Sequence, residues 1–337
     1  MPSAMMKAMD PDGGEVDDAV RILQQGGLVA FPTETVYGLG ADATNPDALR
    51  RLYAVKGRPR NHPVIVHLAT GSADALARWA NPLPPAAQAI ADACWPGPVT
   101  LVLRRASGVP AEVTGGSDTV GVRVPDQPVA QQLLTRFGGG VAAPSANRFG
   151  RVSPTTAAHV RADLGRDVDL ILDGGPCRVG LESTVVDCTE PDPVILREGA
   201  LAREDVEAIV GRSVPLRTDG SRAAPGTLDS HYSPSARIVL VTDHEIGSRA
   251  ARLAADGQRV GVLTQHPTLD LPDGVEVLDV PPSIDELAHE LYTLLRDADR
   301  RHLDVLLAVP PAPVGLGAAV ADRLTRAARR STLEPGP

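Results

Sequence analysis

The sequence is poor in aromatic residues and in lysine. Only 3% of its 337 residues are Phe, Trp or Tyr, so the hydrophobic cores must be built mainly from Val, Leu, Ile and Ala. Lysine occurs at two positions, Lys7 near the start and Lys56 within an otherwise arginine-rich chain. A compact ammonium bonds differently from the planar arginine fork, which makes Lys56 a candidate functional residue. Chance explains the same distribution equally well.

Cysteine is also scarce, and acidic residues outnumber basic ones. Cys94, Cys177 and Cys188 are odd in number and form no C-x-x-C pair, which favours reduced, buried thiols in a cytoplasmic protein. The start, MPSAMMKAMDPDGGE, lacks the apolar core of a signal peptide, and no run is long enough for a membrane span. The net charge of −9 argues against nonspecific binding of nucleic acid or membrane, although a local basic pocket stays possible.

Apolar runs bounded by Gly and Pro alternate with segments of helical periodicity over the first 210 residues. Strands are expected near 28–31, 63–68, 99–103, 119–124, 140–143, 169–172, 183–187 and 193–197. Helices are expected near 15–25, 46–55, 72–80, 85–94, 127–136, 155–163 and 203–210. Because some of these strands follow one another directly, the sequence predicts an α/β layer with a mixed sheet.

A second unit follows a stretch rich in Pro, Gly and Ser. Residues 213–236, SVPLRTDGSRAAPGTLDSHYSPSA, have no sustained apolar period and are typical of a linker. Strands RIVLV, RVGVLT, GVEVLDV and LDVLLAVP then alternate with helices near 247–255 and 283–300 and at the end of the chain. This β-α-β alternation predicts a small Rossmann-like domain with a parallel sheet.

Several common chemistries have no support. The chain contains no G-x-x-x-x-G-K-[ST], no H-E-x-x-H and no G-x-S-x-G, and its eight histidines lack metal-ligand spacing. GLGADA and GLGAAV are weak matches to a dinucleotide-binding loop, and tight turns explain their glycines as well.

Three stretches carry hydroxyl or cationic side chains at useful places. PTETVYGLG follows a strand, where α/β sheets bind ligands, but a turn in which Thr35 bonds the local backbone explains it better by itself. KGRPRNHPVIVH brings Lys56, Arg58 and Arg60 into a proline-stiffened turn, which suits a polyphosphate or, equally, a solvated loop. TVGVRVPD places Arg123 in an apolar strand, where it needs an internal ion pair or a bound carboxylate.

Two further stretches place small polar side chains after apolar runs. APSANRFGRVSPT offers Ser145, Asn147 and Ser153 as partners for a purine or a phosphate, with helix capping by Ser153 as a strong alternative. LESTVVD and ILREG bring Ser183 and Arg197 to the ends of neighbouring strands. Each signal is weak singly, and their combined order and spacing carry the weight.

Taken in order, these stretches resemble the YrdC-type threonylcarbamoyl-AMP synthases, in the two-domain form with an extra C-terminal domain. WPGPVTLVL, the linker APGTLDSHYSP and the tail GLGAAVADRLTRAA extend the resemblance over nearly the whole chain, with Val64 as a mild departure from the usual leucine. It implies a flexible tail at 1–13 and a YrdC-like domain with an open, twisted mixed sheet at 14–212. A linker or lid at 213–236 and a Rossmann-like domain at 237–331 would follow.

The resemblance also implies an activity. L-Threonine and bicarbonate or CO2 would condense with ATP to give threonylcarbamoyl-AMP and pyrophosphate, as a nucleotidyltransferase does. A downstream transferase complex would use the product to make N6-threonylcarbamoyladenosine in tRNA, so that tRNA is contacted at most indirectly. The protein would be cytoplasmic and have no membrane partner.

The implied site residues fall into two groups. Lys56 and Arg58 would be catalytic, offsetting charge on the α-phosphate together with Mg²⁺, the only expected cofactor, with no metal site formed by the protein alone. L-Threonine is expected among Thr35, His67, Arg123, Ala143 and Ser183, with its carboxylate on Arg123. ATP is expected at Lys56, Arg58, His62, Thr119, Ser145, Asn147, Ser153, Arg197 and Tyr232. Because Tyr232 lies in the linker, GTLDSHYSP is expected to close over the cavity and exclude water.

Other classes stay open at this point. An RNA-binding module would use the positive concavity of YrdC-like domains, but the net charge of −9 and the few aromatics count against it. A carbamoyl-transfer enzyme of the hydrogenase-maturation type also contains a YrdC-like domain, but its usual zinc-finger cysteines are absent here. A catalytically silent regulator is least favoured, because Lys56, Arg58, Ser145 and Asn147 are all present.

Overall fold

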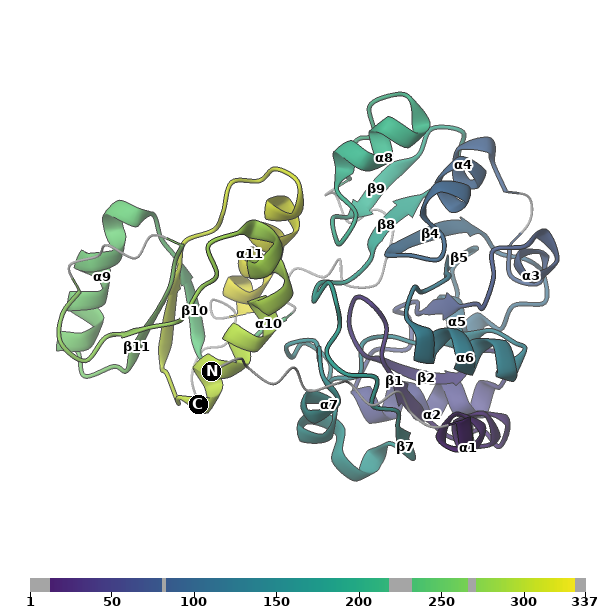
Figure 1. Ribbon diagram of the computed structural model, residues 1–337, viewed down its shortest axis with the longest axis horizontal. Coiled ribbons are helices and arrows are strands. Elements are labelled where there is room, and N and C mark those ends of the chain that lie inside the picture. The colour runs from purple at the N-terminus through teal and green to yellow at the C-terminus, as the bar shows by residue number, and fades with distance from the viewer. Residues whose placement is uncertain (1–12, 81–82, 218–231, 266–270, 331–337) are drawn as a thin grey trace, which may run out of the picture.

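The computed structural model describes residues 13–80, 83–217, 232–265 and 271–330, which form two α/β units of unequal size (Figure 1). The predicted tail lies outside the described residues except for Gly13, which begins the first helix. Most of the predicted linker or lid at 213–236 also lies outside them, and its described parts are 213–217 and 232–236.

The larger unit holds a nine-stranded sheet and its helices. Its strands are β1 (Val29–Phe31), β2 (Gly38–Asp42), β3 (Ile65–His67), β4 (Val99–Arg104), β5 (Thr119–Arg123), β6 (Val141–Ala142), β7 (Leu170–Ile171), β8 (Thr184–Asp187) and β9 (Val194–Arg197). Its helices are α1 (Gly13–Gln24), α2 (Pro46–Lys56), α3 (Ala73–Ala77), α4 (Pro85–Cys94), α5 (Ala111–Thr114), α6 (Pro128–Phe137), α7 (Ala157–Leu164), the 3-10 turn η1 (Gly165–Asp167) and α8 (Arg203–Val210).

The sheet of the larger unit is mixed, as the sequence predicts. Its strand order is β7-β1-β2-β6-β3-β5-β4-β8-β9, with parallel pairing at β7-β1, β3-β5 and β4-β8 and antiparallel pairing elsewhere. The apolar side chains of β4 and β5 are buried, as expected for strands covered on both faces. This order brings the C-terminal ends of β3 and β5 to the same edge as the N-terminal end of β8, and the turn after β1 folds against the end of β5.

The strand β2 is an element that the sequence analysis missed, because its glycines suggest a turn. It runs antiparallel to β1 and pairs Gly40 with Val29. A Cβ atom at Gly40 would lie 2.9 Å from side-chain atoms of both Phe31 and Val141. Glycine therefore serves here to let the side chains of the two neighbouring strands, Phe31 and Val141, close over β2.

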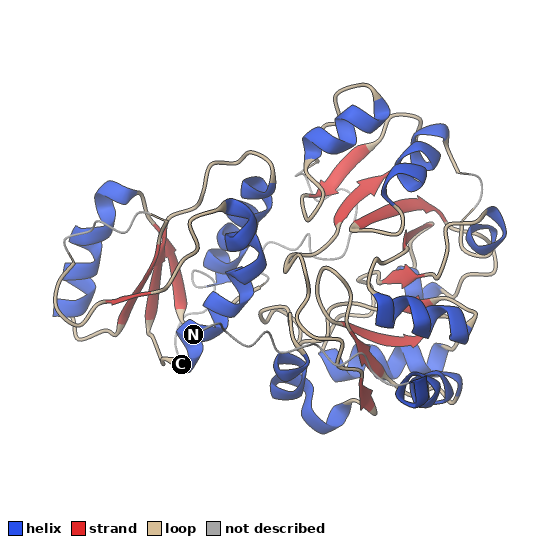
Figure 2. Cartoon of the chain, viewed as in Figure 1, coloured by secondary structure: helices blue, strands red, loops and turns tan. Residues whose placement is uncertain are grey.

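The smaller unit carries a four-stranded parallel sheet in the order β10-β13-β11-β12. Its elements are β10 (Arg237–Leu240), α9 (Asp243–Ala255), β11 (Val260–Leu263), β12 (Glu276–Val277), α10 (Ile284–Arg300), β13 (Val305–Ala308) and α11 (Leu316–Arg330). Helix α9 begins four residues before its predicted start, because Thr242 and Glu245 form a capping box. Figure 2 shows helices on both faces of this sheet.

Helices α10 and α11 form the side of the smaller unit that faces the larger one (Figure 1). One hydrophobic cluster contains Val36, Val152 and Leu181 from the larger unit together with Leu291 and Val320 from these helices. Because a shared apolar core resists relative motion of two units, this contact fixes the segments around Leu181.

Candidate active site

A narrow cavity of about 50 Å³ opens in the larger unit beside these strand ends. Of the predicted site residues, those that line it are Thr35, Arg58, His67, Arg123, Ala143, Ser145, Ser183, Arg197 and Tyr232. Other lining residues are Thr33, Val36, Gly38, Ile65, Pro144 and Glu182. The fold thus gathers predicted threonine and ATP residues around one cavity, although their positions in the sequence range from 35 to 232.

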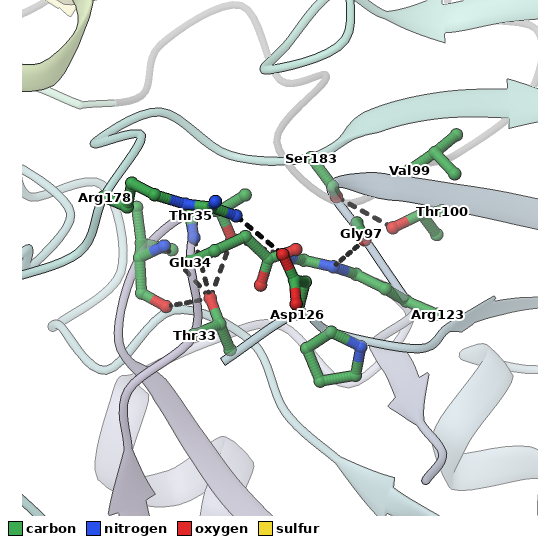
Figure 3. A network of polar contacts seen from close by, with 12 residues as sticks. Thr33, Glu34, Thr35, Gly97, Val99, Thr100, Arg123, Asp126, Arg178 and Ser183 are labelled. Atoms are coloured by element: carbon green, nitrogen blue, oxygen red, sulfur yellow. Dashed lines mark hydrogen bonds and ion pairs between the residues drawn. The ribbon is translucent and has the colours of Figure 1, made fainter. Parts of the chain in front are cut away.

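Arg123, at the end of β5, forms the internal ion pair that the sequence left open. Its Nη2 atom lies 2.7 Å from Glu34 Oε1, its Nη1 donates to Thr35 Oγ1 at 2.8 Å, and its Nε donates to Gly97 O at 3.3 Å. Figure 3 shows the turn after β1 folded against this guanidinium. Arg123 and Glu34 are 3% and 1% exposed, so the pair is shielded from solvent.

The turn itself is stabilised by Thr33 rather than by Thr35, which the sequence favoured. The Thr33 hydroxyl donates to Val36 O at 2.6 Å and accepts from the backbone N–H groups of Thr35 and Val36 at 3.2 Å. This leaves the Thr35 hydroxyl directed at Arg123 and at the Thr33 hydroxyl, 2.8 Å from each.

His67 and Ser183 lie on either side of this arginine. Burial, assisted by the nearby charge of Arg123, lowers the pKa of His67 to about 3, so the imidazole is neutral at physiological pH. The Ser183 hydroxyl pairs with Thr100 Oγ1 at 2.8 Å (Figure 3). It also accepts from Arg197 Nη2 at 3.2 Å. A neutral imidazole and a hydroxyl beside a guanidinium form a polar cleft suited to a small zwitterion.

The two predicted catalytic cations have different surroundings. Arg58 lines the cavity and donates to Pro63 O at 2.9 Å, and burial lowers its pKa to about 10, so it stays charged at neutral pH. Lys56 ends α2 and is not itself a lining residue, but its Nζ donates to the carbonyl oxygens of Ser145, which lines the cavity, and Asn147 at 2.5 and 2.6 Å. Burial, with the charge of Arg58, lowers the pKa of Lys56 well below its ordinary value.

Four more predicted ATP residues lie outside the cavity lining. Thr119 begins β5, where its hydroxyl pairs with Ser117 at 2.9 Å. His62 packs against the ring of Phe149. Asn147 donates to Arg148 O and Arg151 O, and Ser153 donates to Glu182 Oε1 at 2.7 Å.

Arg197 and Tyr232 reach the cavity from the second half of the larger unit and from the linker. Arg197 Nη2 donates to Ser183 O at 2.7 Å. Tyr232 has φ of 64°, a left-handed conformation that is unusual for a bulky residue, and its side chain is buried. Such a conformation persists only where surrounding contacts hold it.

Glu182 is a cavity residue that the sequence analysis missed. Its carboxylate accepts from Ser153, from Tyr292 of α10 and from Arg323 of α11. Burial by itself would raise its pKa, but Arg323 and Arg197 outweigh this effect and lower it to about 2. A signal was present, since an acid between Leu181 and an apolar strand needs a cationic partner.

Among residues 13–80, 83–217, 232–265 and 271–330, no group of three His, Cys, Asp or Glu side chains could hold a metal ion. No helix in these ranges has the length and apolarity needed to cross a membrane. The predicted absence of a protein metal site stays a prediction, as does the cytoplasmic location.

Comparisons with known proteins match both units. A family model described as "Telomere recombination" matches residues 21–199, and one described as "Threonylcarbamoyl-AMP synthase, C-terminal domain" matches residues 201–329. The chain belongs to the Sua5/YciO/YrdC family. The resemblance to a two-domain, YrdC-type member of that family is confirmed.

Relatives in this family share most of the chain's length. The threonylcarbamoyl-AMP synthase of Pyrococcus abyssi is 40% identical over 320 residues, covering 92% of each chain. That of Bacillus subtilis is 37% identical over 326 residues, covering 93% of each. A crystal structure of P. abyssi Sua5 complexed with L-threonine matches with a TM-score of 0.87 and 39% identity, covering 94% of both chains. The predicted fold is confirmed, whereas the limits 14–212, 213–236 and 237–331 stay predictions.

Proposed function

We propose that this protein is a threonylcarbamoyl-AMP synthase that condenses L-threonine, bicarbonate or CO2, and ATP. The observation that carries the proposal is one cavity lined by Thr35, Arg58, Arg123, Ser183 and Arg197, in a chain whose full-length relatives bear that name. The P. abyssi structure complexed with L-threonine supports the same substrate here.

In the proposed reaction the threonine carboxylate binds Arg123, with Thr35 and Ser183 beside it. The free amine of threonine takes up CO2, or bicarbonate with loss of water, and becomes a carbamate. A carbamate oxygen then attacks the α-phosphorus of ATP, the bond from that phosphorus to the bridging oxygen breaks, and pyrophosphate leaves. This classes the enzyme as a nucleotidyltransferase.

Cations must offset the charge that gathers when an anion attacks a polyphosphate. Arg58 and Arg197 line the cavity and supply fixed positive charge, and Mg²⁺ enters as part of the ATP complex. Lys56 is predicted to be catalytic. Since its ammonium donates to Ser145 O and Asn147 O, contact with a phosphate would require it to leave one of these carbonyls.

The remaining assignments follow from the same proposal. ATP would extend from Arg58 toward Ser145, Asn147 and Ser153, with His62, Thr119 and Tyr232 as further contacts. The product would pass to a downstream transferase complex that modifies tRNA, with no direct tRNA contact required. The predicted closure of GTLDSHYSP over the cavity concerns residues that lie mostly outside the described ranges.

The test is pyrophosphate release from Mg²⁺–ATP and bicarbonate, with and without L-threonine, by the wild type and Lys56→Ala. Release that depends on threonine and is lost in Lys56→Ala is the expected result. ATP left intact, or consumed equally without threonine, would contradict the synthase activity and favour the RNA-binding alternative. Carbamoyl phosphate as a substitute substrate tests the carbamoyl-transfer alternative.

A further inference from the structure

A buried polar cluster joins the two units next to the cavity, and its members are Ser153, Glu182, Tyr292 and Arg323. Glu182 Oε2 accepts from Arg323 Nε at 2.9 Å and from the Tyr292 hydroxyl at 2.8 Å. Its Oε1 accepts from Ser153 at 2.7 Å and from Tyr292 at 3.0 Å. Both carboxylate oxygens therefore have donors, and the carboxylate as a whole has partners from both units, which is the condition under which a buried charge is well accommodated.

Arg323 is fully buried, with 0% of its side chain exposed, and it bonds to two separate segments of the larger unit. Besides Glu182, its Nη2 donates to Glu198 O at 2.9 Å, while Nη1 pairs with Asp322 at 2.6 Å. It lies on α11 four residues from both Ala319 and Ala327, so it occupies the buried face of the helix. A planar guanidinium with three well-placed acceptors is a rigid connector between segments.

The cluster also holds the residue that the linker sends into the cavity. The Arg323 guanidinium lies 4.9 Å from the centroid of the Tyr232 ring, and the Tyr292 ring stacks on Tyr232 at 5.7 Å. Tyr232 and Glu182 both line the cavity, whereas Arg323 and Tyr292 are absent from its lining. These two side chains of the smaller unit thus act on the cavity only through other residues.

The segment that carries Glu182 is brought close to α10 by a glycine. Gly180 has φ of 80°, and a Cβ atom there would lie 2.3 Å from the carbonyl oxygen of His289. The backbone of the larger unit therefore touches the backbone of α10 two residues before Glu182. Ser183, a predicted threonine ligand, follows directly.

We propose that Arg323 and Tyr292 of the smaller unit are positioning residues for the substrate cavity. They hold the Glu182 carboxylate, and through it the Ser153 hydroxyl and the backbone at Ser183, in the arrangement that receives the substrates. This inference rests on the proposed function, because Ser153 and Ser183 are assigned there to ATP and L-threonine. It gives the smaller unit a defined part in the synthase site, distinct from simply adding stability.

The test compares two contacts that cross the same interface. Arg323→Met removes the guanidinium from the cluster. Arg296→Met, the matched control, breaks the ion pair of Arg296 with Asp163 at 2.7 Å and the hydrogen bond of Arg296 to Val152 O, and neither partner lines the cavity. Binding of L-threonine and of Mg²⁺–ATP to the full chain is measured by titration calorimetry, alongside the melting temperature of each variant.

Both variants should lower the melting temperature, but only Arg323→Met should weaken substrate binding strongly. Loss of a residue that orients a metal ligand typically costs about 10- to 100-fold in affinity. By analogy we expect the affinity for L-threonine to fall about tenfold or more in Arg323→Met and less than about twofold in Arg296→Met. Arg323→Lys, which keeps the charge but cannot reach three acceptors, should fall between Arg323→Met and the wild type. Equal weakening by the two methionine variants, or wild-type affinity in Arg323→Met, would overturn the inference.

If Arg323→Met does not fold, Tyr292→Phe tests the positioning role instead, because this substitution removes only one hydroxyl. A several-fold weaker affinity for L-threonine supports the positioning role, and an unchanged affinity for both substrates refutes it. Binding by the wild type distinguishes failure of the proposed function from failure of the positioning role. Failure of the wild type to bind L-threonine contradicts the proposed function, whereas binding that is insensitive to every variant contradicts this inference alone.

Discussion

Two buried arginine–glutamate pairs flank the cavity, and they differ in how completely the carboxylate is satisfied. Arg123 and Glu34 lie 2.7 Å apart within the larger unit, and within the described residues neither Glu34 carboxylate oxygen has a hydrogen bond of good geometry. Arg323 and Glu182 lie 2.9 Å apart across the interface, and the hydroxyls of Ser153 and Tyr292 also donate hydrogen bonds to the Glu182 carboxylate.

This difference suits the first pair to binding a substrate carboxylate and the second pair to holding the cavity wall in place. Within the described residues the Arg123 Nη2 atom makes no hydrogen bond of good geometry, so this guanidinium keeps a donor for a substrate carboxylate. A carboxylate bonded by three donors, the Ser153 and Tyr292 hydroxyls and the Arg323 guanidinium, costs far more to displace, because each buried group left without a partner is penalised. Arg123 therefore fits the role of substrate ligand, and Glu182 fits the role of a fixed anchor.

The largest expected effect comes from Arg123→Met, which removes the proposed ligand and leaves Glu34 buried without a counter-charge. Breaking a buried pair in this way should destabilise the protein by about 3–5 kcal/mol, and threonine-dependent pyrophosphate release should be lost. Chemical denaturation and the release assay measure the two effects. Adding Glu34→Gln should restore much of the stability and none of the activity; recovery of activity as well would show that Arg123 does not bind the substrate.

Glu182→Gln tests the role of the second pair through the pH dependence of stability. Because the pKa of Glu182 is about 2 in the folded protein against an ordinary 4.5, its ionised form stabilises the fold above that ordinary value. The stabilisation is lost as pH falls from about 5 toward 2. The variant should thus be less stable than the wild type at pH 7, and the gap in the free energy of unfolding should shrink on acidification. A gap that stays constant with pH would show that Glu182 is not the anchor.

A smaller effect is expected from Gly180→Ala, which crowds α10 at the interface. The new Cβ atom would meet the His289 carbonyl oxygen, and overpacking of this kind typically costs about 1–3 kcal/mol. Gly257→Ala is the control, because Gly257 has a similar φ of 78° but nothing within 4 Å of its Cβ position. The KM for L-threonine should rise more in Gly180→Ala than in Gly257→Ala. The same KM in both variants would show that packing at the interface does not affect substrate binding in the cavity.

The smallest effect belongs to a helix far from either pair. Thr242→Ala removes the capping box of α9 and should lower the free energy of unfolding by about 1 kcal/mol. Substrate affinities should not change, as calorimetry can check. An altered affinity for L-threonine would mean that the smaller unit is coupled to the cavity through its whole fold and not through Arg323.

Much of this arrangement could be predicted from the sequence. Apolar runs and helical periodicity located most elements of both units, including the strand that ends at Arg123. The order of short polar stretches led to residues that do line one cavity. Strand β2 was missed because its glycines, which are needed for close packing against Phe31, are also typical of a turn.

The ion pairs could not be predicted, because they depend on contacts between distant segments. The sequence requires a partner for Arg123 but does not choose between Glu34 and a bound carboxylate. Arg323 and Glu182 are 141 positions apart in the chain. The burial of Arg323 could still have been inferred, since it shares a helix face with Ala319 and Ala327.

The most direct test is a crystal structure of this protein with L-threonine bound. We expect the threonine carboxylate to lie within hydrogen-bonding distance of the Arg123 guanidinium, which it takes from Glu34 or shares with it. We also expect the Arg323–Glu182 contact to stay near its present 2.9 Å. L-Threonine bound away from Arg123, or an Arg323–Glu182 contact that opens while Arg123–Glu34 stays closed, would contradict these roles of Arg123 and Glu182.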